Sequence, residues 1–259
     1  MLSLKKTEAE LHDGWLTLWL NRPESRNAID PVIMNEITRV MRWLRKKDEY
    51  VAVVIRGRGK SFCAGADINW MKQSATPGLK QSYSESKRMA AFFKKIYKSE
   101  KIIINLIHGH AFGGAMGFLG TGDFSFTLKD TLFALPEVKL GLFPAVIMPY
   151  LLLRSKTSDL YQKLFTGSVF TPDEALKMGL VNGVYENMKE MESAASALIS
   201  DLKSVSPGAL AEGKKLLRTL HKNLINRKNI KRTIVTLSGL KLSEDAQNRM
   251  AAFTKRPGN

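Results

Sequence analysis

Two glycine-containing segments of this chain have the residue types that expose main-chain amides to a ligand. They span residues 61–68 (SFCAGADI) and 108–117 (HGHAFGGAMG). Each follows a run of apolar residues and precedes a helical stretch. Amides at a helix start have no acceptor within the helix, so two such turns can donate to one oxygen atom. That arrangement is an oxyanion hole, which stabilises negative charge developing on a carbonyl oxygen.

Other reactive side chains near these segments are interpreted as structural. His108 and His110 flank Gly109, and alternate residues of an extended chain point the same way, but no third ligand follows at a recognisable spacing. We therefore expect no metal site. Cys63 lacks a neighbouring base to activate it as a nucleophile, so we expect it to pack as a small apolar side chain. Neither segment matches a phosphate-binding loop.

The elements that must position these segments alternate between strand and helix. Residues 51–55 (VAVVI) and 102–107 (IIINLI) predict strands buried on both faces, and residues 14–20, 124–128, 131–134 and 181–185 predict further strands. Asp30-Pro31 and Thr171-Pro172 are helix-start signals. Strands end at about residue 140, apart from 181–185, and helices dominate afterwards. The pattern predicts an α/β core with a helical C-terminal region.

Composition sets wider limits. The chain has 259 residues, and its single cysteine excludes an internal disulfide framework and fits a reducing compartment. The sequence contains no run of 18 apolar residues that would span a membrane, and it contains no recognisable targeting segment. We therefore expect a cytoplasmic protein. The net charge of +16 favours anionic partners without choosing among them.

Ordered motifs along the chain resemble the crotonase (enoyl-CoA hydratase/isomerase) superfamily from about residue 14 to residue 256. Those motifs lie at residues 21–28, 62–67, 109–114, 136–141, 175–181 and 243–253. The resemblance implies an α/β, crotonase-like spiral of ββα units in residues 1–195, which hold the acyl-CoA site. It implies a helical region in residues 196–259 that covers CoA and joins homotrimers or hexamers.

The same resemblance assigns site residues. The oxyanion-hole amides fall on Ala66 and Gly114, and Glu137 falls on a catalytic carboxylate. The substrate- and CoA-binding positions are Ala64, Gly65, Asp67, Ile68, Gly113 and Arg26. The substrate is expected to be an acyl-CoA thioester, with no cofactor apart from the coenzyme A that it carries.

The reaction depends on a missing carboxylate. Hydratases of the superfamily hold water between two glutamates, but the first of these positions is Gly117. Finer resemblance to a bacterial 3-methylglutaconyl-CoA hydratase-like branch favours hydration of a 2-enoyl-CoA, with Lys139 or Arg154 as candidate partners of the distal carboxylate. A single glutamate equally suits a Δ3-Δ2 enoyl-CoA isomerase or a decarboxylase.

A non-catalytic alternative remains. A crotonase homologue without the first glutamate could bind polyanions through the basic residues between 214 and 232. The sequence has no nucleic-acid-binding motif, so we expect nucleic acid not to be the partner.

Overall fold

The computed structural model describes residues 3–67, 69–70, 79–155, 157–220, 244 and 248. They form two compact units, Met1–Ile199 and Ser200–Asn259. The division of roles between residues 1–195 and 196–259 stays a prediction. None of the helices among the described residues is long and apolar enough to cross a membrane.

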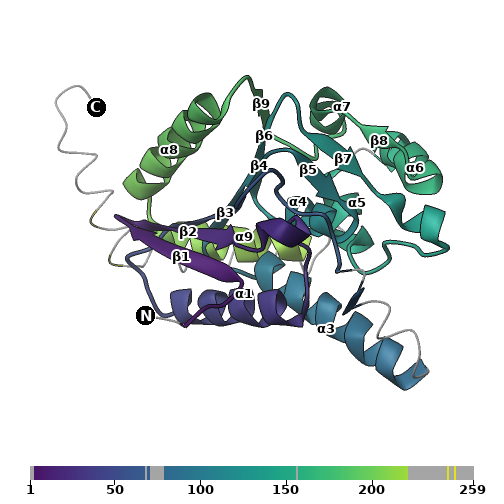
Figure 1. The fold of residues 1–259 in the computed structure, drawn as a ribbon. Coiled ribbons are helices and arrows are strands. Elements are labelled where there is room, and N and C mark those ends of the chain that lie inside the picture. Colours follow the sequence, from purple (N-terminus) through teal and green to yellow (C-terminus); the bar gives the residue numbers. More distant parts are fainter. Residues whose placement is uncertain are drawn as a thin grey trace. The chain divides into compact units, whose positions relative to one another are not determined.

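The centre of the first unit is a six-stranded sheet in the order β1-β2-β3-β4-β6-β9 (Figure 1). β1 and β2 are antiparallel, and the remaining pairs are parallel. The bounds of these strands are Thr7–His12, Trp15–Leu20, Ala52–Gly57, Ile102–Ile107, Phe124–Leu128 and Gly183–Tyr185. A second sheet pairs β5 (His110–Phe112), β7 (Leu132–Ala134) and β8 (Val169–Phe170) in the order β5-β7-β8.

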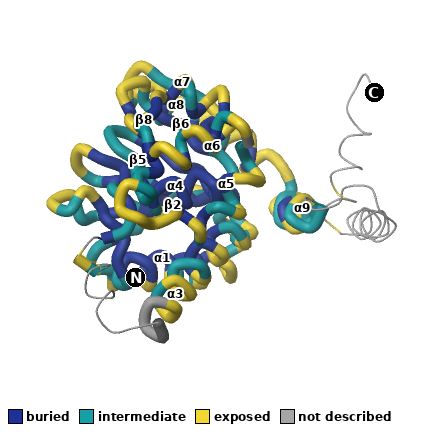
Figure 2. The backbone as a smooth tube through the Cα atoms, turned by 90° about the vertical axis from the view of Figure 1, so that its right-hand side faces the viewer, coloured by how far each residue is buried: buried dark blue, intermediate teal, exposed yellow. Residues whose placement is uncertain are grey.

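Helices cover both faces of the large sheet. α1 (Pro31–Leu44) and α3 (Leu79–Tyr97) lie on one side and α8 (Met188–Ser204) on the other (Figure 1). The short α4 (Met116–Thr121) is buried throughout, as the dark tube in Figure 2 shows. The remaining helices of the first unit are η1 (Pro23–Ser25), η2 (Gly113–Ala115), η3 (Pro136–Leu140), α5 (Met148–Arg154), α6 (Thr157–Thr166) and α7 (Pro172–Lys177). The second unit contains α9 (Pro207–Leu220).

Most predicted elements are confirmed. β3 and β4 are buried on both faces, because α1 and α3 cover one face and α8 the other. The Asp30 carboxylate accepts from the Ile33 amide at the start of α1, and Thr171 and Glu174 form a capping box at α7.

Three strands were not predicted. β1 alternates charged and apolar residues and becomes a strand by pairing with β2 across an Asp13-Gly14 turn. β5 and β8 are too short for a sequence pattern and exist only because β7 lies between them. β5 lies inside the segment 108–117, which was interpreted as a turn.

A buried carboxylate joins the first strand to the first helix. Glu36 on α1 is 5% exposed. Its oxygens accept from the amides of Lys5 at 2.6 Å and Lys6 at 3.0 Å, and from the Thr7 hydroxyl at 2.9 Å. These bonds hold the start of β1 and the two residues before it against α1. Loss of the acceptor would leave donors without a partner, which lowers the free energy of unfolding.

We predict that Glu36→Gln lowers the free energy of unfolding by about 1.5–3 kcal/mol, because an amide NH₂ would face donors that now meet a charged acceptor. Urea denaturation measures the loss. Glu49→Gln, at an exposed carboxylate, is the control. A Glu36→Gln variant as stable as the wild type would contradict this role.

Candidate active site

The segment 61–67 is held as the middle of three adjacent chain segments. On one side it forms a parallel bridge between Ala66 and Ile29. The Ile29 amide donates to Gly65 O at 2.7 Å, and the Asp67 amide donates to Ile29 O at 2.9 Å. In a parallel bridge of this pattern the middle residue points its own N–H to the other side. The Ala66 amide therefore faces away from Ile29.

On that other side lies the segment that follows β4. The Cys63 amide donates to His110 O at 3.0 Å, and the Phe112 amide donates to Cys63 O at 3.2 Å. The two predicted turns are thus joined directly, as expected from neighbouring parallel strands β3 and β4. A Cβ atom built on Gly114 would lie 3.4 Å from the Ala66 nitrogen. The structure therefore brings Ala66 and Gly114 together.

Two glycines permit this close approach. Gly65 has φ +96° and Gly113 has φ +52°, both in the left-handed region that glycine occupies without strain. A Cβ on Gly65 would lie 2.6 Å from Phe112 O and 3.2 Å from the Gly114 nitrogen. Any side chain at position 65 would therefore push the two segments apart.

Glu137 lies against the second segment. It is in the first turn of η3, after Pro136, and its Oε1 would be 2.9 Å from a Cβ built on Gly113. Its Oε2 is buried and has no hydrogen-bond partner among the described residues. Burial raises the pKa of the Glu137 carboxyl, and a hydrogen bond from its own main-chain amide opposes this shift only in part. A desolvated carboxylate with one oxygen unbonded, lying beside Gly113, is suited to proton transfer.

The position of the missing carboxylate is filled by apolar side chains. A Cβ on Gly117 would lie 2.4 Å from ring atoms of Phe93 and 2.7 Å from Cγ2 of Ile147. Phe93, on α3, is fully buried and packs edge-on against Phe118, with ring centroids 5.8 Å apart. Glycine at position 117 is therefore a packing requirement, and no sequence pattern pointed to the role of Phe93.

Two polar residues position the first segment. Asn27 adopts φ +56° and is fully buried. Its side-chain Nδ2 donates to Arg58 O at 2.9 Å and to Ser61 O at 2.8 Å. Arg22 forms an ion pair with Asp67. Both lie in the motif at 21–28, but their partners are distant in sequence, so sequence reasoning did not assign these contacts.

The Asp67 carboxylate is occupied within the protein. It accepts from the amides of Asn69 at 2.9 Å and Trp70 at 3.1 Å, as a helix N-cap does. Burial raises its pKa, but the hydrogen bonds from Arg22 and from these amides outweigh burial and leave the pKa below its ordinary value. Asp67 therefore has a clear structural role, while its predicted contact with CoA stays a prediction.

The remaining predicted CoA-binding residues are less tightly grouped. Ala64 is half-buried, and its amide donates to Arg26 O at 2.9 Å. The Arg26 side chain is exposed, next to the first segment. Ile68 lies outside the described residues. The hydrogen bond between the main chains of Ala64 and Arg26 thus places Arg26 beside the segment that contains Gly65 and Ala66.

The histidines and the cysteine have structural partners. His108 Nε2 lies 2.9 Å from Gly59 O, and His110 Nδ1 lies 3.1 Å from Ser61 Oγ. Burial raises the pKa of Cys63 to about 12, so its thiol is protonated at neutral pH. Among the described residues, no group of three histidine, cysteine or acidic side chains is arranged to hold a metal ion.

Comparison with known proteins decides the family. Residues 10–257 match the family model described as enoyl-CoA hydratase/isomerase. The chain belongs to the enoyl-CoA hydratase/isomerase family. The predicted superfamily is therefore confirmed, and the site described above is the candidate active site of an acyl-CoA enzyme.

Individual relatives agree with this family assignment. The mitochondrial Delta(3,5)-Delta(2,4)-dienoyl-CoA isomerase of Mus musculus is 31% identical over 232 residues, which cover 82% of this chain and 67% of the relative. The short-chain-enoyl-CoA hydratase of Clostridium acetobutylicum is 31% identical over 201 residues, covering 76% of this chain and 75% of the relative. The crystal structure of an enoyl-CoA hydratase from Shewanella pealeana superimposes with a TM-score of 0.93 at 29% identity, over 97% and 94% of the two chains. The predicted crotonase-like fold is confirmed.

We predict that Gly114→Ala lowers kcat/KM for an enoyl-CoA thioester about 10²–10³-fold, because the methyl group would occupy the space beside the Ala66 amide. The methyl contacts are no closer than 3.4 Å, so the fold should survive, which thermal unfolding can verify. Gly213→Ala, where a Cβ would meet nothing within 4 Å, is the control. Unchanged turnover in Gly114→Ala would contradict the assignment of this space to the substrate oxygen.

Proposed function

We propose that this chain isomerises enoyl-CoA thioesters, with Glu137 as the single carboxylate that moves the proton. The observation that carries the proposal is the ring of Phe93 in the space beside Gly117. A second glutamate at position 117 would collide with that ring. Water held between two carboxylates, the arrangement used for hydration, therefore has no counterpart at this position.

The proposed reaction needs only groups that the site contains. The amides of Ala66 and Gly114 donate to the thioester oxygen and stabilise negative charge there. Glu137 removes a proton from the α carbon of a 3-enoyl-CoA, and electrons move into the thioester to form a dienolate. The resulting carboxylic acid returns the proton to the γ carbon, which moves the double bond into conjugation. The burial that raises the Glu137 pKa makes the carboxylate a stronger base for the first step.

Hydration and decarboxylation remain the competing reactions. The resemblance to a bacterial 3-methylglutaconyl-CoA hydratase-like branch favours hydration, and relatives named hydratases and relatives named isomerases both match this chain. The filled space at Gly117 is the reason for placing isomerisation ahead of hydration. No contact among the described residues specifically favours decarboxylation.

The finer prediction of a 3-methylglutaconyl-like acyl group gains no support from the two candidate cations. The Arg154 guanidinium donates to Gly122 O at 2.5 Å and to Asn182 Oδ1 at 2.6 Å. Lys139 is exposed and its side chain lies near Gly167. We therefore propose an acyl chain without a second carboxylate.

Assembly and location complete the proposal. Phe143, Phe165 and Tyr161 form an exposed aromatic cluster with exposed fractions of 46%, 66% and 44%. An exposed apolar patch of this kind supports self-association, and we propose a homotrimer or hexamer. We further propose that the enzyme works in the cytoplasm and needs no cofactor besides the CoA of its substrate.

We predict that the wild type converts a 3-enoyl-CoA to the conjugated 2-enoyl-CoA faster than it hydrates a 2-enoyl-CoA. Glu137→Gln should lower the isomerisation rate about 10²–10⁴-fold, because the amide cannot accept the proton. Ultraviolet absorbance of the conjugated thioester follows the isomerisation, and chromatography separates the hydrated product. The value of kcat/KM should fall at low pH, because Glu137 must be ionised to act as the base. The apparent pKa of this fall should lie above the pKa of an ordinary glutamate, because burial raises the pKa of Glu137.

Glu36→Gln is the matched control, because it alters a buried carboxylate on α1 that contacts the start of β1. It should lower stability and leave the isomerisation rate unchanged. Hydration that outpaces isomerisation would reject the proposed reaction. Equal isomerisation in the wild type and Glu137→Gln would remove Glu137 from the mechanism.

We predict that Gly117→Glu alone is strongly destabilised, because its Cβ would overlap the Phe93 ring. Phe93→Ala/Gly117→Glu should recover stability and hydrate a 2-enoyl-CoA faster than Phe93→Ala does. Thermal unfolding and hydration assays on the three variants measure both effects. A stable Gly117→Glu variant would show that Phe93 does not exclude a second carboxylate.

A further inference from the structure

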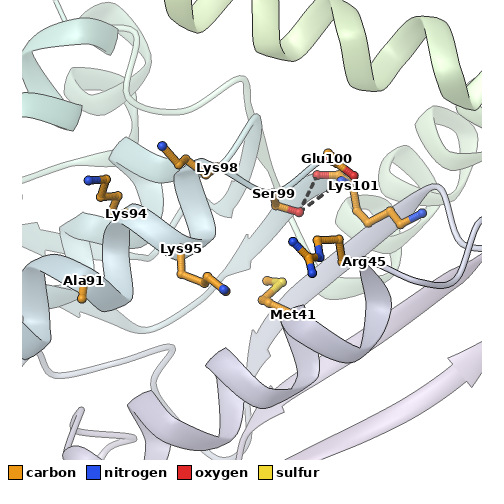
Figure 3. Close-up of a pocket in the computed structure, with 9 residues that line it drawn as sticks. All are labelled: Met41, Arg45, Ala91, Lys94, Lys95, Lys98, Ser99, Glu100 and Lys101. Carbon is orange, nitrogen blue, oxygen red and sulfur yellow. Dashed lines mark hydrogen bonds between the residues drawn. The ribbon is translucent and has the colours of Figure 1, made fainter.

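A concave basic site lies at the end of α1 and α3. It is a cavity of about 410 Å³, a volume within the range of small-molecule sites. Among the described residues that line it are five cations and one carboxylate: Arg45, Lys94, Lys95, Lys98, Lys101 and Glu100. In Figure 3 the side chains of Arg45 and Lys95 point toward the same space above Met41, from opposite helices. We call this site the basic cavity.

The cations of the basic cavity are not needed to cap the two helices. Positive side chains often gather at helix C-termini, where they bind the last carbonyl oxygens. Here the Met41 carbonyl accepts from the Arg45 amide at 3.3 Å, and the Ile96 carbonyl accepts from the Ser99 amide at 2.9 Å. Among the described residues, the side-chain N–H groups of Arg45, Lys94, Lys95 and Lys98 are therefore available for another acceptor.

Most of these cations have no acidic partner among the described residues. Lys101 forms an ion pair with Asp48 at 3.9 Å. Within the part of the chain that the structure describes, no carboxylate lies at ion-pair distance from Arg45, Lys94, Lys95 or Lys98. Like charges gathered around one cavity repel each other, and a bound anion would relieve that repulsion.

The basic cavity is separate from the candidate active site. Lys101 immediately precedes β4, whereas His108 to Gly114 follow it. The strand between them is six residues long, which places the two sites at opposite ends of β4, roughly 17–20 Å apart. The basic cavity therefore cannot hold the thioester that faces Glu137.

We propose that the basic cavity binds two adjacent phosphate groups of a small molecule, either inorganic pyrophosphate or a nucleoside diphosphate. Lysine ammonium groups on flexible stems act as point charges that suit phosphate oxygens. Met41 and Ala91 supply an apolar part of the lining, on which a nucleoside base can rest. The cations surround a cavity rather than forming the extended stripe that a nucleic-acid backbone requires, so a compact anion fits better.

Isothermal titration of the whole chain with pyrophosphate, ADP and adenosine, at about 0.15 M ionic strength, tests this proposal. The expected result is saturable binding of one pyrophosphate or ADP per chain. Lys95→Ala/Lys98→Ala should weaken it about ten-fold or more, because two charge-assisted contacts are lost. Tighter binding of ADP than of pyrophosphate would identify a nucleotide site, and equal binding a diphosphate site.

Lys177→Ala/Lys189→Ala removes the same charge from exposed lysines elsewhere and is the matched control. It should change the affinity by less than about two-fold. Turnover of enoyl-CoA should be unchanged in both double variants, which separates this test from the proposed isomerase function.

Three results would overturn the proposal. The first is no saturable binding of either diphosphate. The second is equal weakening in both double variants, which would assign the binding to the overall charge of +16. The third is tighter binding of single-stranded RNA than of pyrophosphate through Lys95 and Lys98, which would identify a nucleic-acid surface.

Discussion

The chemistry that we propose depends on two main-chain N–H groups, those of Ala66 and Gly114, which the fold brings close together. Hydrogen bonds on both sides of the segment 61–67 fix its direction: Ile29 bonds it on one side, and the segment after β4 bonds it on the other. A parallel bridge satisfies the neighbours of Ala66 and leaves its own amide facing Gly114. If main-chain groups do this work, side-chain identity matters mainly through size, and the 2.6 Å approach of a Cβ on Gly65 to Phe112 O explains the glycine at position 65.

The second constraint is apolar packing around one carboxylate. Burial keeps one oxygen of Glu137 without a partner among the described residues and raises its pKa, so the carboxylate is a better base than an exposed glutamate. Phe93 packs where a second carboxylate would otherwise enter. In the isomerisation that we propose, an aromatic ring in this place links core packing to the choice of reaction, since one carboxylate transfers a proton without holding a water molecule.

Sequence reasoning predicted the parts of this structure that leave local patterns. The apolar runs indicated β3 and β4, and the caps Asp30 and Thr171 indicated two helix starts. The glycine-containing turns indicated the two segments that meet. It could not predict contacts between residues far apart in sequence. The Phe93 ring against Gly117 belongs to this class, as do the Asn27 bonds to Ser61 O and Arg58 O. Such contacts depend on how α3 and the first turn pack, which no local pattern encodes.

A crystal structure with a saturated acyl-CoA bound tests the central claim most directly, because this ligand has the thioester but no double bond to react. We predict that the thioester oxygen lies about 2.7–3.1 Å from the nitrogens of both Ala66 and Gly114. A thioester oxygen bonded to neither amide would contradict the account, even if the CoA portion lay beside the same two segments.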